Sequence, residues 1–301
     1  MKHRAVLAAF LTLCTVLWCG CSSKEPEILP PLDPYEAKAT LSDADMNELV
    51  RYLSHPSVDV FGQERAEKLL RSAGLKVIPV VLRHLNAHGK KPTRMTEIKL
   101  RRILLTILKN IGNHVDGLDT ADKEQQKKNI TALRTISRKH FGYDHRATKK
   151  QRDAAVKKWR AWYESLYSPA VVDTLLAMFT TEIVGIKKAA AAALVAAGGD
   201  KVLPKVFALL HGEKTPPRRV QVELRKILLT LGAGRPEIIG DLIPMLDDDD
   251  EAIRHAAVLE LRRQSKKRFG YDYGLPAAKR APAVKQWRDW YQQEGKKKRG
   301  K

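Results

Sequence analysis

The stretch LIPMLDDDDEAIRHAA occupies residues 242–257. It joins an apolar segment to an amphipathic one through four consecutive aspartates, and acidic side chains are favoured in the first turn of a helix. Apolar residues at spacings of three and four continue the pattern outward, as in Leu224, Ile227, Leu228 and Leu231. This spacing is typical of amphipathic helices, and no segment shows the alternation of a strand. The sequence therefore predicts an all-α fold.

An aromatic motif occurs twice along the chain. FGYD at residues 141–144 recurs at residues 269–272, and VKKWRAWY at residues 156–163 recurs as VKQWRDWY at residues 284–291. Both pairs are separated by the same offset of 128 residues. A shared offset without gaps indicates one structural unit that has been duplicated.

The duplication extends upstream of the aromatic motif. LRRILLT at residues 100–106 matches LRKILLT at residues 224–230, now at an offset of 124. Small insertions account for the change of offset. We therefore expect two tandem lobes, residues 41–166 and residues 169–293, each ending in a Trp-rich helix.

A shorter unit recurs within the lobes. Prolines stand 40 residues apart at Pro204 and Pro244, each within a pair of expected helices. Paired helices at this period resemble HEAT or armadillo-type repeats. In that family an acidic turn and an arginine early in the next helix stack between units, and Asp249 or Asp250 and Arg254 occupy those positions. The resemblance implies an α-α superhelix, or solenoid, over most of both lobes, and it implies no particular activity.

The local helix limits are also predicted. Thr148 begins a capping-box pattern before the first Trp-rich helix. The second copy contains Pro276 and Pro282, so we expect it to begin later, between Lys279 and Ala281. The apolar pattern is lost between His114 and Lys128, where a loop is expected.

The first 20 residues have the pattern of an export signal. Lys2 and Arg4 precede an apolar run over residues 5–18, which is shorter than the ~20 residues of a membrane-spanning helix. The run ends in WCGC, which resembles the lipobox of bacterial lipoproteins. We expect residues 1–20 to be a lipoprotein signal peptide and Cys21 to be the lipidation site, carrying acyl chains such as palmitate. The alternatives are a plain cleaved signal with an incidental cysteine and a permanently uncleaved membrane anchor.

Cysteine usage and the following segment agree with lipidation. All three cysteines lie at or before residue 21, so the body can form no disulfide and has no cysteine nucleophile. Residues 21–40 contain the lipidated Cys and a Pro-rich tether, which we expect to be extended. Ser22 follows the acylated residue, and in Gram-negative lipoproteins this implies sorting to the outer membrane, facing the periplasm.

The chain is strongly basic. Its formal charge is +21, and removal of the leader with Lys2 and Arg4 leaves +19. Such a charge favours acidic partners. Residues 294–301 form a basic tail that could bind anionic lipid or polymer or could simply be a solvated end, and export makes nucleic acid the least expected partner. The charged residues of this tail that we single out are Lys296, Lys297, Lys298 and Arg299.

The aromatic motif has two interpretations. The Trp-rich helices could cover the apolar end of each lobe, as atypical terminal elements do in repeat proteins. They could alternatively form a binding surface, because Trp, Tyr and Arg are enriched at the centres of interfaces. The motif resembles pairs at the ends of HEAT-like lobes in other bacterial exported proteins, and this resemblance implies a family trait but no particular ligand. The candidate lobe-capping or partner-binding residues are Trp159, Trp162, Tyr163, Trp287, Trp290 and Tyr291.

Motifs for chemistry are not recognisable in the sequence. It contains no nucleotide-binding glycine motif and no Gly-x-Ser-x-Gly. His84 and His88 have a spacing that can hold a metal, but no third ligand is implied nearby. We therefore expect no catalytic residues, no metal and no cofactor. The expected function is a non-catalytic, lipid-anchored scaffold for a protein of the cell envelope; the alternatives are a basic adaptor for an anionic surface and, third, a HEAT-fold enzyme.

Overall fold

The protein is an array of packed helices. The computed structural model describes residues 29, 31–38, 40–87, 92–181 and 183–295. Every element of regular structure in these ranges is a helix or a helical turn, and consecutive helices pack side by side, which confirms the prediction of an all-α, solenoid-like fold. The predicted signal peptide, Cys21, most of the tether and the basic residues 296–299 lie outside the described residues.

The helices are short and follow one another closely. In chain order they are α2 (Asp33–Glu36), α3 (Asp43–Tyr52), α4 (Val60–Ser72), α5 (Val77–Leu85), α6 (Arg94–Asp116), α7 (Lys123–Ser137), α8 (Lys149–Ser165), α9 (Pro169–Ala177), α10 (Val184–Ala197), α11 (Gly199–His211), α12 (Arg218–Leu231), α13 (Ile239–Leu242), α14 (Glu251–Ser265) and α15 (Ala277–Trp290). Shorter helical turns are η1 (Gly74–Lys76), η2 (Met178–Thr180), η3 (Pro236–Ile238), η4 (Pro244–Asp247) and the π-turn η5 (Tyr291–Gly295).

Polar side chains begin several of these helices as their sequence predicts. Ser42 accepts a hydrogen bond from the backbone N–H of Asp45 at the start of α3, and the carboxylate of Asp45 accepts one from the backbone N–H of Ser42. Thr148 and Gln151 form the same reciprocal box at the start of α8. Each box satisfies two backbone donors that a helix end otherwise leaves unpaired.

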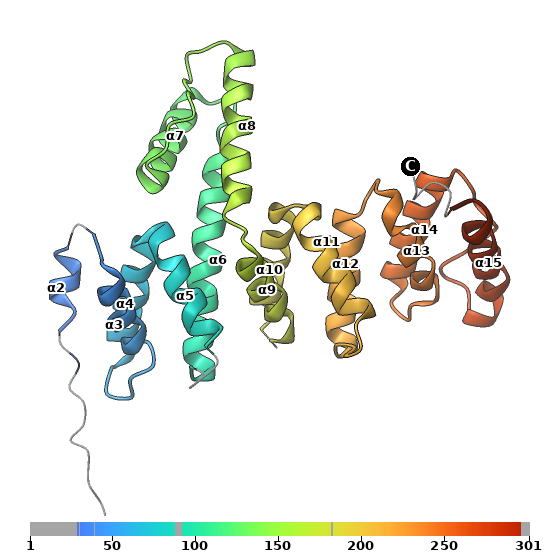
Figure 1. Cartoon of the computed structure of the whole chain (residues 1–301), viewed down its shortest axis with the longest axis horizontal. Coiled ribbons are helices and arrows are strands. Elements are labelled where there is room, and N and C mark those ends of the chain that lie inside the picture. The colour runs from blue at the N-terminus through green and yellow to red at the C-terminus, as the bar shows by residue number, and fades with distance from the viewer. Residues whose placement is uncertain (1–28, 30, 39, 88–91, 182, 296–301) are drawn as a thin grey trace, which may run out of the picture.

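The main body is a row of antiparallel helix pairs (Figure 1). Successive pairs are α3–α4, α5–α6, α9–α10 and α11–α12, and each packs on the next. The two lobes meet where α9 contacts α5 and α10 contacts α6. The buried apolar side chains of all these pairs form one continuous core.

Two predicted helix limits are wrong. The loop expected over residues 114–128 is reduced to six residues, because α6 continues to Asp116 and α7 begins at Lys123. The helix α15 begins at Ala277, directly after Pro276, and contains Pro282 in its interior. Proline costs about 3 kcal/mol in an isolated helix interior; here the burial of Val284, Trp287 and Trp290 on the same helix compensates for it.

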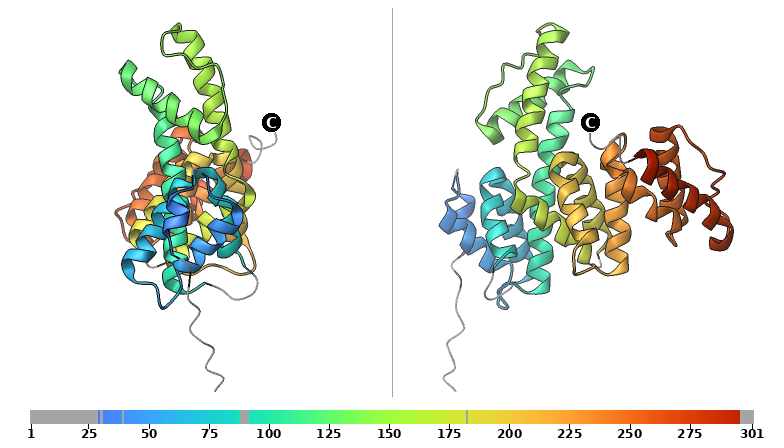
Figure 2. Two further views of the ribbon diagram at one scale, coloured as in Figure 1. Left: turned by 90° about the vertical axis from the view of Figure 1, so that its left-hand side faces the viewer. Right: turned by 45° about the vertical axis from the view of Figure 1, so that its right-hand side comes forward.

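The first lobe has an arm that stands out from the row. The lower part of α6 packs within the row, whereas its upper part, together with α7 and α8, projects to one side (Figures 1 and 2). The helix α6 has 23 residues, which corresponds to a length of about 34 Å. We call the upper part of α6 with α7 and α8 the first-lobe module.

The second lobe holds the copy of this module along the row. Its elements are α13, η4, α14 and α15, which we call the second-lobe module (Figure 1). Residues 231–238, LGAGRPEI, replace residues 107–110, ILKN, of the first lobe. The four additional residues end α12 at Leu231 and change the repeat offset from 124 to 128. An insertion about as long as one helical turn therefore separates the second-lobe module from α12. In the first lobe the corresponding residues are continuous within α6.

Candidate functional site

The paired aromatic motifs form the interior of the two modules. Trp159 and Trp287 are completely buried. The ring of Phe141 meets the ring of Trp159 edge to face at 4.7 Å, and Phe269 meets Trp287 in the same way at 4.8 Å. Aromatic rings prefer this arrangement to a face-to-face stack. The FGYD and Trp-rich segments thus form one packed unit in each lobe.

Hydrogen bonds repeat between the modules as closely as the ring contacts. The hydroxyl of Tyr143 donates to the carbonyl oxygen of Leu118 at 2.8 Å, and the hydroxyl of Tyr271 donates to that of Leu246. Arg134 donates to the carbonyl oxygen of Tyr143 at 2.7 Å, as its counterpart in α14 does in the second module. Burial raises the pKa of both tyrosine hydroxyls, so they remain neutral donors. These contacts hold each FGYD turn against the helices on either side.

The remaining motif residues are also largely inside the protein. Trp162 is 8% exposed, Trp290 7% and Tyr163 9%, and Tyr291 is half-buried. The rings therefore leave little surface for a partner. In the first lobe, α8 packs along α6, and the end of the lobe is covered instead by α9 and α10.

A groove lies between the first-lobe module and α10. It has a volume of about 640 Å³ and is lined by residues of α6, α8 and α10. Alanines form most of the α10 wall, and their small side chains allow a close approach of another backbone. These alanines are Ala189, Ala192, Ala193 and Ala196.

Two tyrosines form the opposite part of this groove. The hydroxyl of Tyr163 donates to the carbonyl oxygen of Leu108 at 3.0 Å and lies 2.6 Å from the hydroxyl of Tyr167. Burial raises the pKa of both hydroxyls. Lys109 and Lys188 add positive charge to the lining. Asp116 and Glu164 add negative charge, so the groove is an apolar channel with charged side chains of both signs beside it.

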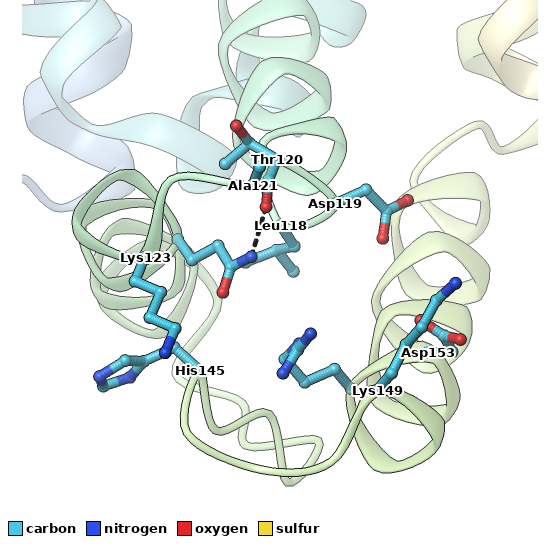
Figure 3. A pocket seen from close by; sticks show the side chains of 10 residues that line it. Leu118, Asp119, Thr120, Ala121, Lys123, His145, Lys149 and Asp153 are labelled. Carbon is cyan, nitrogen blue, oxygen red and sulfur yellow. Dashed lines mark hydrogen bonds between the residues drawn. The ribbon is translucent and has the colours of Figure 1, made fainter.

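A second hollow is polar and lies inside the first-lobe module. It has a volume of about 510 Å³ and lies between the turn after α6 and the first turns of α7 and α8. Figure 3 shows Lys123 and His145 on one side of it and Lys149 and Asp153 on the other. We call this hollow the basic cavity. Both it and the groove escaped prediction from the sequence.

The acidic turn of the second lobe is closed by an internal arginine. Arg254 is 7% exposed and donates to the carbonyl oxygens of Asp248 at 2.8 Å and Asp249 at 2.9 Å. It also donates to the carbonyl oxygen of Tyr273 at 2.9 Å. Asp250 caps α14. The arginine therefore binds main-chain oxygens of its own module.

The histidine pair singled out in the sequence does not form a metal site in the described residues. Among the described residues, no group of three or more His, Cys, Asp or Glu side chains is placed to hold a metal ion. His84 shares a hydrogen bond of 3.0 Å with Asn47, and His88 lies outside the described residues. Within the described part of the chain, no helix is long and apolar enough to cross a membrane.

Comparisons with known proteins find no match: no protein-family model fits the chain, and no curated protein shows significant sequence similarity to it.

Proposed function

We propose that this protein is a non-catalytic, lipid-anchored scaffold that binds a protein partner in the cell envelope through the groove between α6, α8 and α10. The observation that carries the proposal is the groove itself, because its α10 wall presents several alanines beside two buried tyrosines. Helical arrays with long surfaces are suited to binding other proteins. Cys21 holds this surface at the membrane, on the outer membrane facing the periplasm.

The geometry of the groove favours a helix as the bound segment. The α10 wall runs from Gly185 to Ala196, about 17 Å of helix. An amphipathic helix places an apolar residue on one face at every third or fourth position, and a wall of this length matches three turns. The lining also carries charges of both signs, because Lys109, Arg160 and Lys188 can pair with acidic side chains of a partner, and Asp116 and Glu164 with basic ones. The partner is therefore an envelope protein with an exposed amphipathic helix that has charged side chains beside its apolar face.

Crosslinking of the acylated protein in membranes, followed by pull-down, tests this proposal. Ala192 is exposed in the groove, and Ala192→Glu places a charged side chain there without entering the core. Ala252 is an exposed alanine of α14, and Ala252→Glu is the matched control. We expect the first variant to lose the crosslinked protein and the second to retain it. Recovery of lipid alone would favour the basic-adaptor alternative, and equal recovery by both variants would place the partner elsewhere.

A separate experiment tests the anchor. Replacing Cys21 by Ala should release the protein into the soluble fraction while leaving the groove intact. If the variant stays with the membrane, the basic residues 296–299 are the better candidate for membrane attachment.

A further inference from the structure

The two modules complete the same turn in different ways. In the second lobe the guanidinium group of Arg254 fills the space behind the turn and binds three carbonyl oxygens. The matching residue of the first lobe, 128 positions earlier, is Gln126. Its shorter side chain reaches only one of the equivalent oxygens, that of Thr120, through a hydrogen bond drawn as a dashed line in Figure 3. The basic cavity lies where the second lobe has a guanidinium group.

Two neighbouring positions beside this turn also hold different side chains in the two lobes. Tyr273, whose ring stacks on His255 at 4.1 Å in the second lobe, is replaced by His145. Ala277 is replaced by Lys149. The first exchange places a smaller ring beside the first-lobe turn, and the second adds a positive charge there.

The charge of the cavity lining favours an anion. Three positive and two negative side chains line it, whereas the matching positions of the second lobe hold two positive and four negative ones. Among the residues that the structure describes, neither Lys123 nor Lys149 forms an ion pair with a carboxylate. Two ammonium groups are therefore available to a negatively charged ligand.

A buried hydrogen-bond acceptor in the cavity wall, the side-chain oxygen of Gln126, favours a ligand that also has a donor. Gln126 is 5% exposed, and its Oε1 atom has no hydrogen-bond partner among the described residues. The orientation of its amide is fixed, because only Nε2 can donate to the carbonyl oxygen of Thr120. A buried acceptor without a donor is unfavourable. A ligand with an N–H group would supply the missing donor.

We propose that the basic cavity of the first-lobe module binds a compound in which a secondary amide N–H stands beside a carboxylate. The amide donates to Oε1 of Gln126, and the carboxylate pairs with Lys123 and Lys149. N-acyl amino acids and the carboxyl end of a peptide share this chemistry. A cavity of about 510 Å³ lies within the ~300–1,000 Å³ of small-molecule sites.

Calorimetric titration of the purified chain tests the two required groups. The probe is acetyl-trialanine with a free carboxylate. A second compound, the same peptide with a carboxyl-terminal amide, lacks the negative charge. A third compound, with an ester oxygen in place of the last N–H, lacks the hydrogen-bond donor. We expect each change to weaken binding at least about tenfold, because a hydrogen bond or ion pair to a buried group is lost. Equal affinity for all three compounds would overturn the proposal. N-acetylalanine distinguishes the sources: affinity equal to that of the tripeptide indicates a free N-acyl amino acid, and weaker affinity a peptide end.

The second lobe supplies the matched variant. Gln126→Arg copies Arg254 and should fill the cavity, abolishing binding while the melting temperature is kept or raised. Retained binding by this folded variant would contradict the proposed site. The basic cavity is separate from the helix groove, so Ala192→Glu should bind the probe normally. Loss of the groove partner and loss of probe binding are therefore distinguishable failures.

Discussion

Gly112 leaves room for the hydroxyl group of Tyr163, whose oxygen lies 2.7 Å from the point that a Cβ atom on residue 112 would occupy. Gly240 and Tyr291 repeat the same relationship at 2.7 Å. A glycine inside α6, here near the C-terminal end of the helix, is unfavourable by itself, costing about 1 kcal/mol relative to alanine. Close contact between α6 and the buried tyrosine explains why glycine is present.

Gly112→Ala should destabilise the protein although it improves helix propensity. Overpacking costs about 1–3 kcal/mol, so a net loss of about 1 kcal/mol is expected in urea unfolding. Gly185 of α10 has no atom near its Cβ position, and Gly185→Ala should instead stabilise by about 0.5–1 kcal/mol. The loss should shrink in a Tyr163→Phe background, which lacks the interfering oxygen. Stabilisation by both alanine variants would contradict the close contact.

Trp159→Ala and Trp287→Ala should each lower the melting temperature. Both rings are completely buried, and removing such a ring costs about 3–5 kcal/mol. Phe61 is 76% exposed, and Phe61→Ala should cost about 0.5 kcal/mol or less. Thermal unfolding of the three variants checks the comparison. Unchanged stability with loss of a partner would show that these rings bind instead of pack.

Arg254→Gln gives the second lobe the side chain of the first. It removes the buried guanidinium donor of three main-chain carbonyl oxygens, and the expected loss is about 2–4 kcal/mol. Arg288 pairs with Asp247 at 3.0 Å near the surface, and Arg288→Gln should cost about 1 kcal/mol or less. Chemical denaturation measures both. Similar losses would mean that the buried arginine is no more important than a surface pair.

Glu260 should make stability depend on pH under acidic conditions. Hydrogen bonds from Arg263, then from the Gly234 N–H and from Gln264, lower its pKa to about 2. The unfolded chain binds this proton near pH 4.3, so the contribution is complete above that pH and disappears as the pH falls towards 2. Glu260→Gln should cost about 2 kcal/mol at pH 7 after allowance for solvent screening. The difference from the unmodified protein should vanish near pH 2; a difference independent of pH would contradict this assignment.

Replacing residues 231–238 by Ile-Leu-Lys-Asn should convert the second lobe to the geometry of the first. The chimera restores the sequence that makes α6 continuous, so α12 and α13 should merge into one helix and the second-lobe module should turn out of the row. Small-angle X-ray scattering would detect the changed shape, and circular dichroism the additional helix. An unchanged scattering profile would show that the insertion is not what directs the module.

Sequence periodicity was sufficient to predict the helices and the capping box at Thr148, because these depend on local spacing and on polar residues at helix starts. Pro276 and Pro282 misled the prediction for α15, since burial of Trp287 and its neighbours outweighs the cost of an internal proline. The groove depends on how α10 packs against α6, a contact between lobes that no local pattern encodes. The difference between Arg254 and Gln126 at matching positions of the two lobes was visible in the sequence. It became informative only when the structure placed each side chain behind its turn.

The burial of the tryptophans also provides an optical signal. Trp18 lies in the predicted leader, and the other four tryptophans lie in the Trp-rich segments of the two modules. The indole N–H groups of Trp159 and Trp287 are buried and have no hydrogen-bond acceptor among the described residues. An indole in such surroundings emits at shorter wavelength than one in water. Tryptophan fluorescence, excited selectively in a chain without residues 1–20, therefore reports on these two modules. Replacing both tryptophans of one module by phenylalanine would leave only the signal of the other module.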